Sequence, residues 1–427
     1  MQNYQISQEL HSFSKTFERT LSKPQLGRLK EMMHGIIRGQ EANLSEMARQ
    51  NRRKAGKTVR KQVEQYGNML ESFPMEELLI QKLKGLRGDI SPDTPLYYDL
   101  VDISKKHTKG FEDVGATWDG SEGNPGRGYE IIDVSVLQKD CATTLWRHLY
   151  STAEEGYKSE LEEMRKMLTY FQIAWGGLLG SWYFDEGNDS NKKIELCLSH
   201  EMTFTIRMNV NRGNQDRIIE LPDGERVKMM ELWGEKAQGM TMWQSKRKKK
   251  DKRLVQLQWE KIVWKHKGKP VPLYLVWCHR EGDPRPAVFL TSRTITDEEG
   301  ASLIYHGYFN RGKEEAGFKQ DKFKLGMEKV QLRSLHKTKQ LMKVYVLVDQ
   351  LLSKIYLTIL EMGNFIYDLL KGFLKGTQRT ITKWAVADWY DALCYKMERE
   401  FIRFKRRYPP GKANSQPSLF TNPLQIW

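Results

Sequence analysis

The sequence has little cysteine, and none of it is arranged to bind zinc or to build a disulfide framework. The four cysteines are scattered singly, without a Cys-x-x-Cys pair and without histidine at ligand spacing: Cys141, Cys197, Cys278 and Cys394. This pattern argues against structural zinc and favours a reducing cytoplasm. Long apolar runs are missing too. Polar residues from Asp349 to Lys354 interrupt the most apolar stretch, 344–360, so we expect a buried amphipathic helix there rather than a membrane span.

Two further features are absent from the sequence. The first residues contain no basic segment followed by an apolar run, so no signal peptide is expected. There is no Walker loop, so we expect no nucleotide cofactor. Together with the missing membrane span, these absences predict a cytoplasmic protein without a membrane partner.

Positive charge, by contrast, is abundant. The chain of 427 residues carries 69 Lys and Arg against 54 Asp and Glu, a formal net charge of +15. Such a balance indicates a polyanionic partner, most simply nucleic acid, although ribosomal or membrane-surface association fits the charge alone. Aromatic residues at 11% and hydrophobic residues at 39% indicate a folded chain, long enough for two or three domains.

The most informative segment reads YFNRGKEEAGFKQDK, from Tyr308 to Lys322. Tyr308, Arg311, Glu315 and Lys322 are separated by three, four and seven residues, and these steps return to nearly one face of a helix. Glu314 lies off that face. A carboxylate between two cations and a phenol makes a poor core, but it can hold a metal ion beside a phosphodiester. A surface helix with a charge ladder gives the same pattern, so this segment alone leaves both interpretations open.

Metal-dependent phosphoryl transfer needs two or three carboxylates that converge on Mg²⁺, because hard cations prefer oxygen ligands. An acid directly after a buried strand is held rigidly and still reaches solvent. Asp185 follows the aromatic run Gly180–Phe184 in this way. Asp99 and Asp102 both lie in or beside the apolar run Leu96–Ile103, where an unpaired carboxylate is costly. The residues themselves do not decide between these two aspartates.

The spacing of Tyr308, Arg311, Glu315 and Lys322 is similar to the Y-(2)-R-(3)-E-(6)-K signature of DDE transposases of the insertion-sequence family four type. The chain resembles this family along most of its length. The resemblance implies an α/β fold with an RNase H-like catalytic core, in which a mixed five-stranded sheet is packed with helices. It also implies two Mg²⁺ ions as cofactors, with Mn²⁺ as a substitute.

Upstream elements extend the resemblance. Asp119-Gly120-Ser121 with Gly126–Tyr129 is similar to the family pattern D-G-S…G-x-G-Y, and Asp185–Asp189 to its D-R-G-x-D or D-R-E-A-D element. In the family the first catalytic aspartate ends an apolar run, which assigns that role to Asp99 and supporting positions to Asp102 and Ser104. Asp102 stays the alternative to Asp99.

The resemblance thus implies a catalytic and metal-binding set formed by Asp99, Asp185 and Glu315. Arg311 and Lys322 would contact phosphates, while Tyr308 would hydrogen-bond a phosphate or pack beneath the metal site. Phe289 is expected in the core, and no residue is assigned to stacking an extruded base.

The chain departs from the family at two positions. Glu186 stands where the family usually has arginine, which exchanges a potential phosphate contact for a repulsive charge. Gly312 stands where tryptophan is common, and we expect looser packing under the helix there.

Composition and periodicity suggest a division of the chain into six parts. These are a helical DNA-binding domain, the first part of the catalytic core, a β-rich insertion, the second part of the core, a helical region for dimerisation and a disordered tail: 1–90, 91–200, 201–285, 286–345, 346–408 and 409–427. Within them we expect strands at Leu96–Ile103, Tyr129–Leu137 and Gly177–Phe184, and helical structure over 139–176.

Two basic clusters are expected to contact DNA. The first lies where Asn43 or Ser45 and then Thr58 would cap successive short helices. Its members are Arg49, Arg52, Arg53, Lys54, Lys57, Arg60 and Lys61. The second lies in the run 246–253 inside the β-rich insertion, and we place contacts to the phosphate backbone at Lys248, Lys249 and Lys250. A solvated basic loop is the alternative for each cluster.

The sequence therefore predicts a cut-and-paste DNA transposase that hydrolyses and transesterifies phosphodiesters at the terminal inverted repeats of an insertion sequence. Its partners would be double-stranded DNA, at the repeats and at the target, and a second copy of the chain in a synaptic complex near the bacterial nucleoid. The alternatives are an inactive or domesticated DNA-binding relative, and a metal nuclease that never joins strands.

Overall fold

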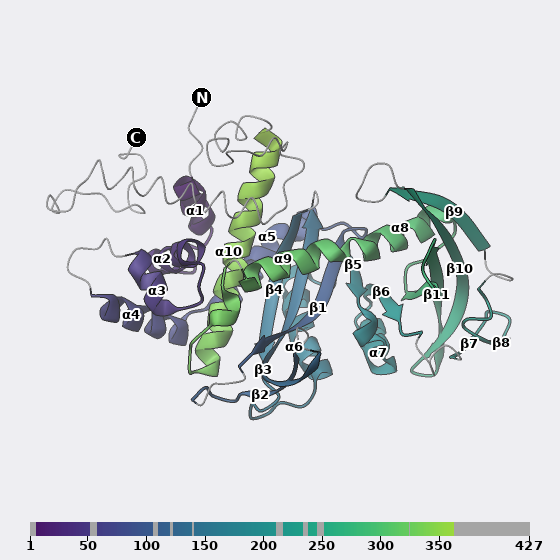
Figure 1. Cartoon of the computed structure of the whole chain (residues 1–427), viewed down its shortest axis with the longest axis horizontal. Coiled ribbons are helices and arrows are strands. Elements are labelled where there is room, and N and C mark those ends of the chain that lie inside the picture. The colour runs from purple at the N-terminus through teal and green to yellow at the C-terminus, as the bar shows by residue number, and fades with distance from the viewer. Residues whose placement is uncertain are drawn as a thin grey trace. The chain divides into compact units, whose positions relative to one another are not determined.

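The computed structural model describes residues 6–51, 58–105, 110–119, 123–138, 141–210, 217–233, 238–245, 252–323 and 325–362. The fold is mixed α/β (Figure 1). Two units are each assembled from separate stretches of the chain. The first unit comprises residues 1–82, 100–158 and 313–427, and the second comprises 83–99 and 159–312.

Helices dominate the N-terminal part of the first unit, as predicted. They are α1 (Ile6–Lys15), α2 (Lys23–Gly39), α3 (Leu44–Gln50), α4 (Val59–Ser72) and the start of α5 (Met75–Leu86). Asn43 caps α3 by accepting hydrogen bonds from the backbone N–H groups of Ser45 and Glu46, and Thr58 caps α4 through Lys61 N–H. Both predicted caps are confirmed, because such caps depend only on neighbouring residues.

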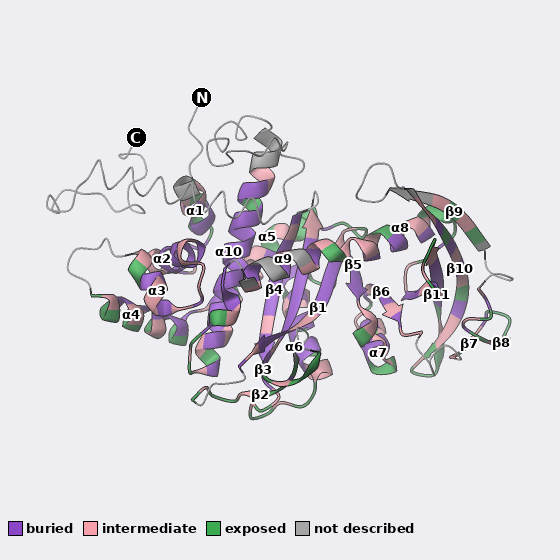
Figure 2. Cartoon of the chain, viewed as in Figure 1, coloured by how far each residue is buried: buried purple, intermediate pink, exposed green. Residues whose placement is uncertain are grey.

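The long helix α10 (Leu335–Met362) packs on the strand β4 and on α1, α2 and α4 (Figure 1). Its middle is buried, as Figure 2 shows, and includes the apolar run from Val344 to Val348. The predicted buried helix is thus confirmed. No helix in the described part of the chain combines the length and the apolar character needed to cross a membrane.

The strands of the first unit form an antiparallel group. β3 (Asn124–Gln138) pairs with β2 (Gly115–Asp119) and with β4 (Cys141–Tyr150). The helical prediction over 139–176 is wrong for β4 and correct for α6 (Glu160–Trp175). β4 is buried on both faces, so its apolar residues do not alternate with polar ones as in a half-buried strand.

A buried charge network ties β3 and β4 to the helices of the first unit. Arg147 of β4 is fully buried, and its guanidinium pairs with Asp133 of β3 and with Asp321 of α9 (Arg311–Phe323). Asp349 of α10 accepts the backbone N–H of Thr144 at 2.6 Å. Burial, opposed by Arg147 and aided by Asp349, raises the pKa of Asp321 to about 8.

The second unit has a parallel core. The first half of β1 (Pro95–Ser104) pairs in parallel with β5 (Ser181–Phe184), and β5 pairs in parallel with β6 (Thr203–Met208). The helix α7 (Asn191–Ser199) connects β5 to β6, and β12 (Ala287–Thr291) joins β6 antiparallel. The predicted strands at β1 and β5 are confirmed.

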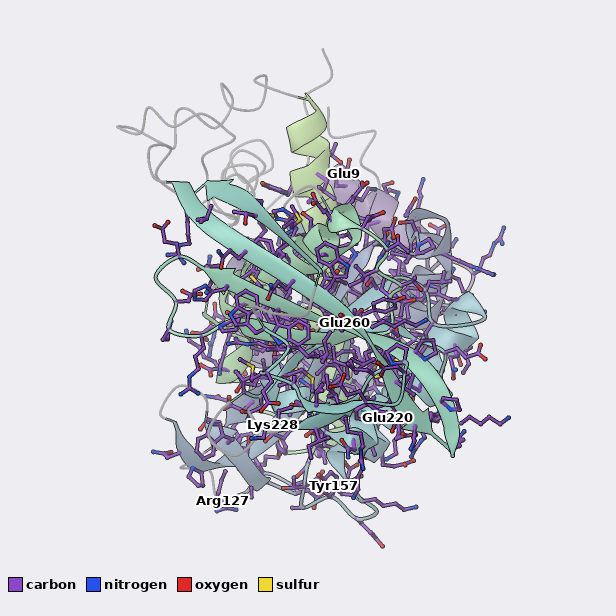
Figure 3. All side chains as sticks on the ribbon, turned by 90° about the vertical axis from the view of Figure 1, so that its right-hand side faces the viewer. Glu9, Arg127, Tyr157, Glu220, Lys228 and Glu260 are labelled. Carbon is purple, nitrogen blue, oxygen red and sulfur yellow. The ribbon has the colours of Figure 1, made fainter. Side chains whose placement is uncertain are left out.

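The rest of the second unit is rich in β-structure, as expected. Its strands are β7 (Ile218–Glu220), β8 (Arg226–Lys228), β9 (Gln238–Ser245), β10 (Lys252–His266) and β11 (Lys269–Arg280). β10 pairs antiparallel with both β9 and β11, and Figure 3 labels Glu260, Glu220 and Lys228 on this part. β6 lies within the range predicted for the insertion, but it pairs with β5 and β12.

The second unit ends in α8 (Glu298–Phe309) and the first residues of α9. Gly307 of α8 packs against Tyr183 of β5, and a Cβ at this position would overlap the tyrosine hydroxyl. Gly312 differs, because it is exposed and a Cβ built there meets no atom of the described residues within 4 Å. The expectation of looser packing at Gly312 stays a prediction, because open space surrounds this exposed position.

These two glycines make a matched pair. We expect Gly307→Ala to lower the free energy of unfolding by about 1–3 kcal/mol, because the buried Tyr183 has no room to move. Gly312→Ala should raise it by up to about 1 kcal/mol, since alanine is the better helix former. Urea unfolding of the two variants measures both changes. Equal shifts in the same direction would contradict the packing described.

The Arg147 network predicts a pH dependence of stability. Because the pKa of Asp321 is higher in the folded chain, the folded state holds a proton between about pH 4 and pH 8 that the unfolded state lacks. The contribution of Asp321 to stability therefore falls as pH rises through this window, by at most about 1.4 kcal/mol per pH unit. Urea titrations at several pH values should show a flatter profile for Asp321→Asn. Asp223→Asn, in an exposed turn, is the control and should keep the parent profile.

Candidate active site

Two predicted acids meet at neighbouring positions of β1 and β5 in the second unit. The register of β1 and β5 pairs Tyr98 with Phe184, so Asp99 and Asp185 each occupy the next position along adjacent parallel strands. Both strands are buried up to that point, and the side chain of Asp185 is 35% exposed just past the end of β5. Asp99 lies in the middle of β1 and is buried.

Arg311 lies between these carboxylates. Its Nη2 is 2.6 Å from Asp99 Oδ1 and 3.9 Å from Asp185 Oδ2. The Arg311 side chain is 13% exposed, so the ion pairs are largely removed from water. Two carboxylates this close repel each other, and the guanidinium offsets that repulsion. Arg311, the first residue of α9, thus pairs with the two aspartates.

A polar chain that sequence reasoning missed reaches Asp185 from the other side. Asn188 Nδ2 donates to Asp185 Oδ1, and Lys193 Nζ donates to Asn188 Oδ1 at 2.6 Å. Lys193 also pairs with Glu160 at 2.5 Å. Asn188 and Lys193 are both buried. The available signal was an amide three residues after the predicted acid, within the element that resembles the family's.

Glu186 is paired with a cation. Arg207 of β6 places Nε 3.6 Å from Glu186 Oε2, and both side chains are partly exposed. Arg207, on the neighbouring strand, therefore partly offsets the negative charge of Glu186, which stands where the resembled family usually has arginine. Sequence reasoning did not single out Arg207, because only the pairing of β5 with β6 brings it near Glu186.

Tyr308 is buried under the site and not exposed beside it. Its ring packs on Phe289, with centroids 4.6 Å apart, and Phe289 is fully buried as expected. Burial raises the pKa of Tyr308, and the charge of nearby Arg207 opposes this shift. Packing beneath the site, one of the two expected roles, agrees with this placement.

The remaining residues of the signature belong to the first unit. Glu315 lies one helical turn after Arg311 along α9 and is half-buried, whereas the alternative Glu314 is buried. Lys322 Nζ is 2.6 Å from Glu328 Oε1 and 3.7 Å from Asp102 Oδ1. Asp102 therefore pairs with the signature lysine rather than with Arg311.

Three residues of the two basic clusters that are predicted to contact DNA lie in the described part of the chain, and all three are exposed: Arg49, Arg60 and Lys61. Arg49 pairs with Glu46 at 3.0 Å in the same helix, and Arg60 and Lys61 lie in the first turn of α4. The other members of the two clusters lie outside the described residues: Arg52, Arg53, Lys54, Lys57, Lys248, Lys249 and Lys250.

The donor set at Asp99 and Asp185 suits a hard divalent cation. Both residues supply carboxylate oxygens, and they already hold one positive charge, the Arg311 guanidinium, between them. Within the described parts of the chain, no three or more Asp, Glu, His or Cys side chains gather around one point. The second unit thus brings two carboxylates together that can serve as metal ligands.

Compared with models of known protein families and with curated proteins, the chain gives no match.

The Arg311 ion pairs predict a link between stability and divalent cations. Arg311→Met leaves Asp99 and Asp185 unopposed, and should lower the free energy of unfolding by about 3 kcal/mol in the presence of EDTA. Millimolar Mg²⁺ should restore stability to this variant more than to the parent, because the cation can then offset the same repulsion. Thermal unfolding with and without Mg²⁺ measures both effects.

Arg293→Met is the matched control. Arg293 pairs with Asp93 in the same unit, but Asp93 is 60% exposed, so the loss should stay below about 1 kcal/mol without a response to Mg²⁺. Equal losses in the two variants would mean that Arg311 contributes no more than a surface ion pair.

Proposed function

We propose that this chain is a DNA transposase of the DDE type, which cuts and joins phosphodiesters at the ends of an insertion sequence with the help of divalent metal ions. The observation that carries the proposal is the meeting of Asp99, within β1, and Asp185, directly after the parallel neighbour β5, around Arg311. The two acids were chosen from separate segments of the sequence, and a surface role would not require them to be neighbours.

An RNase H-like core is part of the proposal. It is supported by the parallel strands β1, β5 and β6 in the second unit, with α7 between β5 and β6, and by the antiparallel pair β3–β4 in the first. In a parallel sheet, acids at neighbouring register positions lie side by side on one face, and Asp99 and Asp185 occupy such positions. This arrangement supports the proposal.

Asp99 and Asp185 would hold the metal, with Glu315 as the third ligand. The case for Glu315 rests on the resemblance and on its place one turn after Arg311. When bound, Mg²⁺ activates water and stabilises the attacking and leaving oxygens of an in-line displacement. The neighbouring protein groups hold the Asp99 and Asp185 carboxylates in place, and the buried strands exclude water from beneath them.

The cations of the site would bind the DNA backbone. Arg311 can exchange its carboxylate partner for a phosphate, which it would contact through two parallel N–H groups. Lys322 would act as a point charge in place of its ion pairs with Glu328 and Asp102. The net charge of +15 supports a polyanionic substrate.

The proposed reaction has two stages. In the first, water adds to phosphorus at the transposon end, the bond to the 3′ oxygen breaks and a 3′ hydroxyl is released. In the second, the oxygen of that hydroxyl bonds to the phosphorus of a target phosphodiester, while the bond from this phosphorus to the target's own 3′ oxygen breaks and leaves a 3′ hydroxyl on the target. One phosphodiester is exchanged for another, so joining the element to its target requires no external energy source. Double-stranded DNA, a second copy of the chain in a synaptic complex and a location at the bacterial nucleoid belong to the same proposal.

The test is cleavage of DNA that carries the inverted repeats flanking the gene, in the presence of Mg²⁺. Asp99→Asn, Asp185→Asn and Glu315→Gln should each reduce cleavage by more than about a hundredfold, the upper cost of losing only an outer partner of a metal. Gel-shift binding of the same DNA should persist, because the substitutions remove negative charge. The exposed Asp223→Asn is the matched control and should cut like the parent.

Two outcomes would redirect the proposal. If all three acid variants cut like the parent, the site is elsewhere. If the parent cuts but cannot join pre-cleaved 3′ ends to a target plasmid, the chain is a metal nuclease without strand transfer. Binding without any cleavage would indicate a DNA-binding relative that has lost the chemistry.

A further inference from the structure

Asp185 is held by a series of hydrogen-bonded polar side chains that the proposed function does not use. The series runs from Glu160 in the first turn of α6 to Lys193 of α7, then to Asn188 and to Asp185. We propose that Asn188 is a positioning residue that orients the Asp185 carboxylate for metal binding, and that Lys193 fixes the amide of Asn188. This inference rests on the proposed function.

Hydrogen-bond chemistry determines which way the amide of Asn188 faces. A lysine ammonium can only donate, so the amide oxygen must point toward Lys193, at 2.6 Å. The amide nitrogen then points toward Asp185, and an ionised carboxylate can only accept. Without Lys193 the amide could turn over and present its oxygen to the carboxylate, which would be repulsive. Lys193 therefore determines that Asn188 presents its amide N–H, a donor, to the Asp185 carboxylate.

The amide engages one oxygen of Asp185 and leaves the other toward the site. Asn188 contacts Oδ1, whereas Oδ2 is the oxygen nearest Arg311, at 3.9 Å. The backbone adds a second restraint, because Asn188 N–H donates to the Asp185 carbonyl at 3.1 Å across the 3-10 turn η2 (Glu186–Asn188). Restraint of one carboxylate oxygen fixes the rotation of the group, so that Oδ2 is presented in one direction.

Burial makes this arrangement costly unless every partner is present. Asn188 is 2% exposed, and Lys193 is 9% exposed with its ammonium 5.9 Å from the centre of the Tyr98 ring. A buried ammonium needs compensation, which Glu160 supplies at 2.5 Å. Such outer partners of metal ligands orient the ligand, and their loss reduces metal affinity by roughly 10–100-fold.

A merely structural role would have a different signature. If Asn188 only closed the turn η2, its substitution would lower stability and leave the affinity for metal unchanged in the folded protein. The distinguishing measurement is therefore metal binding, made on full-length protein that remains folded.

The experiment titrates Mn²⁺ into the full-length protein without DNA and follows free Mn²⁺ by its electron paramagnetic resonance signal. For Asn188→Ala the dissociation constant should rise by roughly 10–100-fold, and for Lys193→Met by a smaller factor. Asn188→Asp keeps the shape but places a carboxylate opposite Asp185, so it should also weaken binding. Lys192→Met, an exposed neighbour on α7, should bind like the parent.

Cleavage then provides the second readout. For Asn188→Ala, the metal concentration at half-maximal rate should rise by the same factor, while the rate at saturating Mn²⁺ returns to within a few fold of the parent. Should Asn188→Ala fail to fold, Asn188→Asp and Lys193→Met test the same contact.

The outcomes separate the inference from the proposed function. If the parent binds Mn²⁺ and cuts DNA, and the Asn188 and Lys193 variants bind Mn²⁺ equally well, the positioning role is wrong and the proposed function stands. If the parent binds no Mn²⁺ and cuts no DNA, both are wrong.

Discussion

The parallel pairing of β1 with β5 imposes the central constraint on the second unit. It places Asp99 and Asp185 at neighbouring positions, where two negative charges would repel each other beside a buried aromatic core. Two contacts around the aspartates offset this repulsion. Arg311 supplies a positive charge from α9, and Asn188 supplies a neutral donor from the turn after β5. A cation and a neutral donor thus hold the two carboxylates side by side.

In the proposed function, the same constraint would couple the binding of metal to the binding of DNA. While Arg311 compensates the two aspartates, it is committed to them, and a phosphate must compete with Asp99 for the guanidinium. In the proposed function a divalent cation takes over the compensation, which frees Arg311 for the backbone of the substrate. Arg207, held by Glu186, is in a similar position on β6. The site thus exchanges internal ion pairs for contacts with its substrate.

Sequence reasoning succeeded where the signal was local. The strands β1 and β5, the caps Asn43 and Thr58 and the buried middle of α10 each follow from a few neighbouring residues. It failed for β4, because burial on both faces removes the alternation by which a strand is recognised. The successes and the error have one cause. Structure that depends on residues close in the sequence could be predicted, whereas structure that depends on packing between distant segments could not.

The same distinction between local sequence signals and long-range packing applies to the candidate site. The choice of Asp99 and Asp185 depended on strand ends and on a resemblance, and the register of β1 and β5 makes them neighbours. Neither source could indicate that Asn188 and Lys193 hold Asp185, or that Arg207 pairs with Glu186, because these partners depend on how the strands and helices pack. The burial of Tyr308 on Phe289 also depends on packing, although its helical face was apparent from spacing.

The Arg147 network has a consequence for how the chain is made. Arg147 finds Asp321 at a separation of 174 residues, and Thr144 finds Asp349 at a separation of 205. During synthesis at about 5–20 residues per second, the sheet formed by β3 and β4 waits roughly 10–40 s before its buried partners emerge from the ribosome. Throughout that interval a face destined for α10 is open to solvent, and Arg147 has Asp133 of β3 as a partner but not yet Asp321. A truncated chain that lacks α10 would therefore fold poorly and would expose a surface to which chaperones bind.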